Sequence, residues 1–91
     1  MKKYVIEREI PGVGRMQREA LEAVAASSNE VLARLAPRVK WLESFVTEDK
    51  TFCVYLAEDE EVIREHARLS HIPATRITQV SGTIDPATGL S

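Results

Sequence analysis

The order of hydrophobic patterns along the chain is the feature that most limits its fold. Residues 4–10 are rich in β-branched and aromatic side chains without a helical period, which predicts a strand. Apolar residues then recur at steps of three and four over residues 20–35, which predicts one long helix. Its predicted buried stripe is Leu21, Val24, Ser28, Val31 and Leu35, with Ala20, Ala25 and Leu32 beside it. We expect this helix to end near Ala36, because Pro37 disfavours helical backbone at the residue before it.

The second half of the chain is predicted to contain two strands, a helix and a last strand. Strands predicted over residues 38–46 and 51–57 are joined by a short polar turn, so they should form an antiparallel hairpin. Asp59 suits the N-cap of a second helix, whose first turn carries Glu60 and Glu61. The buried side of that helix should hold Val62, Ile63, His66 and Ala67. A last strand is expected from Arg76 to Ile84.

The resulting order, βαββαβ, predicts an α+β fold of the ferredoxin-like type. This is a two-layer sandwich in which a four-stranded antiparallel sheet carries both helices on one face. A chain of 91 residues is long enough for one domain. We expect residues 1–86 to form that domain and residues 87–91 to form a flexible C-terminal tail.

Composition narrows the classes of partner. The net charge is −2 and the signs are interspersed, so we expect no nucleic-acid partner, which would require a basic surface. No apolar stretch approaches the roughly 20 residues of a membrane span, and the N-terminal residues lack the apolar core of a signal peptide. Cys53 is the only cysteine, which suits a reducing compartment. These observations predict a cytoplasmic protein.

The middle strands are apolar in both registers, which has a consequence for assembly. Phe52, Val54 and Leu56 should lie on one side of the third strand, and Cys53, Tyr55 and Ala57 on the other. Helices cover only one face of such a sheet, and a large apolar patch on the other face would be left to water. We therefore expect a homodimer packed through the sheet face, or a ligand that covers it.

Four side chains are candidate metal ligands: Glu7, Glu43, Cys53 and His66. Period-two alternation places Glu43 with Trp41 and Phe45, and Cys53 with Tyr55. If these sets share a face with Glu7, carboxylate, thiol and phenol groups converge and suit a divalent transition metal. Tyr55 would then be a hydrogen-bonding partner of the ligands.

Other arrangements of the same residues stay open. If Cys53 faces the helices, it joins His66 and the carboxylates leave the set. In a purely structural interpretation, the carboxylates pair with Arg8, Lys40 or Arg76, and the cysteine is a small core residue. His71, at the end of the second helix, would interact with the negative end of the helix dipole.

Two functions common among proteins of this topology find little support. Residues 11–15 resemble the phosphate loop of acylphosphatases, but the second strand has no asparagine to orient water. RNA-recognition domains stack bases on alternating aromatics of the third strand, whereas Phe52 and Tyr55 point to opposite faces.

Several segments together resemble a family of small bacterial ferredoxin-like proteins, one member of which has been described as nickel-binding. The matching segments are Tyr4–Arg8, Val39–Tyr55, Glu60–Ala67 and Ile84–Pro86. The resemblance implies a ferredoxin-like fold, a homodimer packed through the sheets, and nickel as the bound metal. The chain departs from the family at His71, which precedes Ile72-Pro73 where the family often has Gly-Phe-Pro.

The leading hypothesis is a homodimeric metal-binding protein without a self-sufficient catalytic site. The alternative is a dimeric α+β-barrel protein that encloses a pocket for a small organic ligand, as in cofactor-independent oxygenases. Trp41, Phe45, Tyr55 and His66 would line that pocket.

Overall fold

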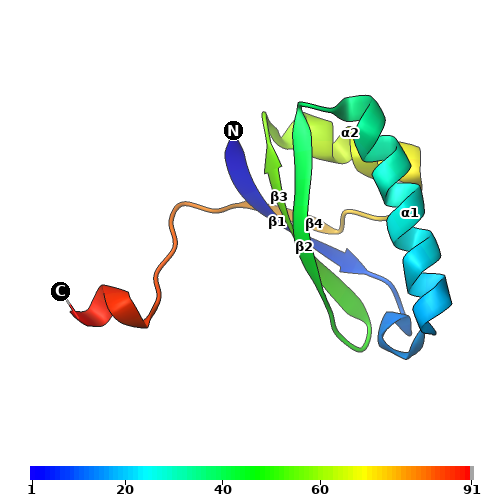
Figure 1. Ribbon diagram of the computed structural model, residues 1–91, viewed down its shortest axis with the longest axis horizontal. Coiled ribbons are helices and arrows are strands. Elements are labelled where there is room, and N and C mark those ends of the chain that lie inside the picture. Colours follow the sequence, from blue (N-terminus) through cyan, green and yellow to red (C-terminus); the bar gives the residue numbers. More distant parts are fainter. Residues whose placement is uncertain (91) are drawn as a thin grey trace.

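The computed structural model describes residues 1–90 and has the predicted order of elements (Figure 1). The strands are β1 (Lys2–Glu9), β2 (Val39–Val46), β3 (Lys50–Ala57) and β4 (Arg76–Gln79); the helices are α1 (Arg18–Leu35) and α2 (Glu60–Ser70). Short 3-10 helices, η1 (Val13–Arg15) and η2 (Pro86–Leu90), follow β1 and β4. The strands form one antiparallel sheet in the order β2-β3-β1-β4. The predicted ferredoxin-like α+β fold is confirmed.

Both helices lie on the same side of the sheet, which gives the sheet two unlike faces (Figure 1). The inner face, toward the helices, contributes Tyr4, Ile6, Val39, Cys53, Tyr55 and Ala57 to the core. The helices contribute Val31, Leu32, Leu35, Val62 and Ile63. The opposite side of β1, β2 and β3, here called the open face, carries the apolar residues Val5, Phe45, Phe52, Val54 and Leu56 and the charged residues Lys3, Glu7, Glu9, Lys40, Glu43 and Lys50.

The two halves of α1 differ in how closely they approach the sheet. The helix is continuous and ends before Ala36, whose extended backbone forms the C-cap, as predicted from Pro37. Only Ser28, Val31, Leu32 and Leu35, all in its second half, are buried. In the first half Leu21 is half-buried and Val24 is exposed. The first half of the predicted stripe therefore faces a space that protein atoms do not fill.

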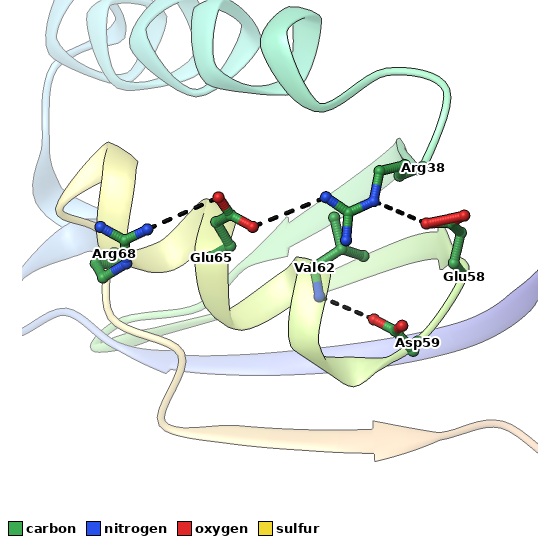
Figure 2. Close-up of polar contacts among 6 residues, drawn as sticks. All are labelled: Arg38, Glu58, Asp59, Val62, Glu65 and Arg68. Atoms are coloured by element: carbon green, nitrogen blue, oxygen red, sulfur yellow. Dashed lines mark hydrogen bonds and ion pairs between the residues drawn. The ribbon is translucent and has the colours of Figure 1, made fainter.

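The start of α2 is fixed by the predicted cap and by ion pairs. Asp59 Oδ1 accepts a hydrogen bond of 3.0 Å from the Val62 backbone N–H (Figure 2). Arg38, just before β2, reaches Glu58 at 2.8 Å and Glu65 at 3.8 Å (Figure 2). Because these charged groups are largely exposed, we expect the pairs to orient the helix more than to stabilise it.

The turn after β1 packs closely against the β2–β3 hairpin. The Gly14 N–H donates to the Glu48 carbonyl at 2.9 Å. A methyl group added at Gly14 would lie 2.6 Å from the Thr47 carbonyl oxygen, well inside van der Waals contact. No side chain other than hydrogen fits between these two backbones.

Gly14→Ala should therefore lower the free energy of unfolding by about 1–3 kcal/mol, the usual cost of forcing atoms into a packed site. Gly82→Ala is the matched control, since no heavy atom lies within 4 Å of a methyl group added there. Urea unfolding of both variants measures the difference. Equal midpoints for the two variants would contradict the close approach.

The chain after β4 differs from the predicted strand. β4 ends at Gln79, whereas the strand was predicted to reach Ile84, and residues 81–90 run away from the sheet (Figure 1). Of the predicted tail, residues 87–90 belong to η2 and residue 91 lies outside the described residues. Within residues 1–90, no helix has the length and apolar character needed to cross a membrane.

Candidate functional site

The two candidate carboxylates lie on the open face. Glu7 pairs with Phe52 across β1 and β3, and Glu43 pairs with Val54 across β2 and β3. Glu7 accepts a hydrogen bond of 2.7 Å from Lys50 Nζ, and this bond raises the pKa of Lys50. Glu43 is exposed.

A β-bulge separates Trp41 from the residues expected beside it. The register shifts between Trp41 and Glu43, so Trp41 pairs with Tyr55 on the inner face while Glu43 and Phe45 turn to the open face. Alternation had placed Trp41, Glu43 and Phe45 together, and that prediction is wrong for Trp41. The indole N–H donates to Ser44 Oγ at 2.9 Å, across the bulge.

The other two candidate ligands, Cys53 and His66, are buried on the opposite side of the sheet from the carboxylates. The His66 ring is fully buried, with Nε2 2.9 Å from Ser28 Oγ and its centroid 5.7 Å from that of Tyr55. Burial, and secondarily the charge of Arg8, lower the pKa of His66 to about 4. The imidazole is therefore neutral at physiological pH. Its Nδ1 has no hydrogen-bond partner among residues 1–90.

The structure thus brings the candidate ligands together only in part. Among the described residues of one chain, no three His, Cys, Asp or Glu side chains are grouped closely enough to hold a metal ion. Glu7 and Glu43 share the open face, whereas Cys53, Tyr55 and His66 belong to the inner layer. Any metal bound by this chain at the open face would need donors from a second molecule or from water.

A cavity of about 460 Å³ lies between the first half of α1 and the inner face. Its apolar wall is formed mainly by Val13, Met16, Leu21, Val24, Ala25, Trp41 and Val46. Its polar lining includes Arg8, Ser28, Thr51, Cys53 and Tyr55. Of the residues expected around an organic ligand, Trp41 and Tyr55 line this cavity, while Phe45 lies on the open face and His66 lies behind Ser28.

Sequence reasoning missed Arg8 as a site residue, although the signal was present. Period-two alternation puts Arg8 on the same side of β1 as Tyr4 and Ile6, which is the inner face. Its side chain is only 2% exposed. The guanidinium donates to the Pro73 carbonyl at 2.8 Å, to the Ile72 carbonyl at 3.4 Å and to Tyr55 Oη at 3.4 Å.

The loop that resembles a phosphate-binding loop is closed by the neighbouring hairpin. The Gly12 N–H donates to Asp49 Oδ1 at 2.8 Å, and the Gly14 N–H donates to the Glu48 carbonyl. Arg15 pairs with the Glu48 carboxylate at 3.0 Å. These bonds leave the backbone amides of Gly12 and Gly14 engaged within the protein.

The position of His71 is explained by the backbone conformation that ends α2. It is the C-cap of α2 and has φ 59, in the left-handed region. Glycine is favoured there because it has no Cβ to strain.

The comparisons with known proteins agree with the fold. A model of the nickel responsive protein SCO4226-like family matches residues 4–80. The crystal structure of SCO4226 from Streptomyces coelicolor A3(2) aligns with a TM-score of 0.76 and 10% identity, over 90% of this chain and 99% of that one. At this identity the likeness supports the fold alone, and a comparison with curated proteins finds no match. The resemblance predicted from the sequence is confirmed: the chain belongs to the SCO4226-like family of nickel-responsive proteins.

Proposed function

We propose that the protein is a homodimeric nickel-binding protein whose two open faces pack together and hold the metal through Glu7 and Glu43. The observation that carries the proposal is the open face itself, an apolar centre with a carboxylate on each side of it. The nickel-responsive family supports the choice of metal. The free buried thiol of Cys53 suits a reducing compartment, so the proposal places the protein in the cytoplasm.

The apolar centre of the open face argues for a partner. Phe45 is 55% exposed and pairs across the strands with Phe52, which is half-buried. Val54 and Leu56 continue this apolar strip along β3. Burial of such a strip against an identical one releases water from both copies, which is the main driving force of association.

A dimer also supplies the donors that one chain lacks. Each open face carries the carboxylates of Glu7 and Glu43, with Glu9 next on the same side of β1, and a two-fold axis brings a second set to the same interface. Nickel(II) accepts carboxylate oxygens and retains water in its remaining positions. Cys53 does face the helices, the arrangement in which it was expected to join His66. The two nevertheless leave the proposed ligand set, because no third His, Cys, Asp or Glu of the described residues is grouped with them and Ser28 engages the imidazole.

Calorimetric titration of nickel into metal-free, untagged protein tests the proposal. We expect saturable binding, and a loss of affinity of about tenfold or more for Glu43→Gln or Glu7→Gln, equivalent to at least about 1.4 kcal/mol. Glu30→Gln is the matched control, since Glu30 is exposed on α1 in the other layer. Absence of saturable heat, or equal affinities for all three variants, would refute the metal site.

A further inference from the structure

We propose that the cavity under the first half of α1 binds a small organic carboxylate, whose charged group pairs with Arg8 and whose apolar body fills the space beside Trp41. This site is separate from the open face, because its lining comes from the inner face and α1. A buried guanidinium repels divalent metal ions, so the ligand of this cavity is not nickel. The proposal stands independently of the nickel site and the dimer.

The first argument is the charge of Arg8. Within the part of the chain that the structure describes, no carboxylate lies within ion-pair distance of this buried guanidinium, and its hydrogen bonds go to neutral oxygen atoms. Burying a charge without a counter-ion is costly, and buried charges in proteins are usually paired. A ligand carboxylate in the cavity would supply the missing charge.

The second argument is the number of donors at this end of the cavity. A guanidinium has five N–H groups, and the hydrogen bonds of Arg8 use three of them. Burial raises the pKa of Tyr55, so its hydroxyl stays protonated and can donate while its oxygen accepts from Arg8. Thr51, which pairs with Arg8 across β1 and β3, also lines the cavity. Together these donors suit the two oxygens of a carboxylate.

No acidic residue of the lining competes with a ligand carboxylate for Arg8. The one acidic residue in the lining, Glu22, is exposed on α1 and pairs with Arg18 at 3.4 Å. His66, behind Ser28, is neutral at physiological pH. Arg8 is therefore the dominant charge in the interior of the cavity.

The third argument is the size and character of the remaining wall. A volume of about 460 Å³ lies within the range typical of small-molecule pockets, about 300–1,000 Å³. Leu21, Ala25, Met16 and Trp41 contribute apolar side chains to the lining. The charged residues that α1 adds to it, Arg18 and Glu22, are exposed and pair with each other. This wall suits an aromatic ring or a short alkyl chain, and so the ligand class is an organic acid with one carboxylate and an apolar body.

Titrations with phenylacetate and hexanoate, each compared with its neutral amide, test the proposal. Trp41 is the only tryptophan and lines the cavity, so its fluorescence reports occupancy alongside calorimetry. We expect the acids to bind about tenfold or more tightly than the amides, because a charge-assisted hydrogen bond exceeds a neutral one. Equal binding of acid and amide, or no binding of either acid at about 10 mM, well above the Kd of even a weak site, would overturn the proposal.

Two variants separate the contribution of the Arg8 charge from that of the cavity volume. Arg8→Met should weaken binding of the acids about tenfold or more, whereas Arg34→Met, at an exposed position of α1, should leave it unchanged. Ala25→Phe keeps Arg8 and fills the cavity, so it should abolish binding of both acids. Nickel binding should be unchanged in Ala25→Phe. Acid affinity that survives both Arg8→Met and Ala25→Phe would place the ligand elsewhere and refute the site.

Discussion

The free energy of unfolding should fall by about 3 kcal/mol through His66 alone as the pH is lowered from 7 to about 4. Its pKa is about 4 in the folded protein and near 6.5 in the unfolded chain, and each unit corresponds to about 1.4 kcal/mol. Between these values the unfolded chain takes up a proton that the buried ring refuses. The stabilisation is complete above pH 6.5 and is lost as the pH falls toward 4.

Urea unfolding at a series of pH values measures this loss, and His66→Gln isolates it from the carboxylates. The stability difference between wild type and His66→Gln should shrink by about 3 kcal/mol from pH 7 to 4. His71→Asn is the matched control, because His71 is exposed and asparagine tolerates its left-handed backbone. This variant keeps His66, so the loss of about 3 kcal/mol should persist in it. An NMR titration that gave His66 a pKa near 6.5 would contradict the account.

Phe45→Glu combined with Phe52→Glu should convert the proposed dimer into a monomer. These side chains face each other across β2 and β3 at the centre of the open face. A two-fold axis would bring four new negative charges into one apolar interface, where unpaired charges are costly. Light scattering should show the mass falling from twice 10.2 kDa to 10.2 kDa. Nickel affinity should fall with it, since the metal needs both chains.

Ile84→Glu is the control for this double variant. Ile84 is also an exposed apolar residue, but it lies beyond β4 in the segment that runs away from the sheet (Figure 1). Its substitution should leave the mass at that of the dimer. A double variant that remained dimeric would show that the subunits meet through another surface.

The fold was predictable because its signals are local and periodic. The α1 stripe, the polar turn between β2 and β3, and the Asp59 cap each specify one element without knowledge of the others. The end of β4 was not predictable in this way. Residues 80–84 read as a strand, but β1 begins at Lys2, and the Val80 N–H makes the last backbone bond to it, at Lys3.

The site was less predictable because it depends on the register of the strands and on how α1 packs against the sheet. One extra residue in β2 moves Trp41 to the face opposite Glu43, and no feature of the local sequence marks the bulge. Alternation puts Arg8 on the inner side of β1 with Tyr4 and Ile6, but a charged side chain in a charged segment is usually exposed, so its burial was not expected. The cavity lies under the first half of α1, where no residue of the helix is buried, and a helical stripe does not encode how closely a helix approaches the sheet.

Sedimentation equilibrium of the metal-free protein, repeated with nickel, tests the central claim most directly. The account predicts a monomer–dimer equilibrium with a mass approaching twice 10.2 kDa, whose dissociation constant falls when nickel is added, because a metal shared by two chains binds only the dimer. A species that stayed at 10.2 kDa at every concentration, with and without nickel, would contradict it.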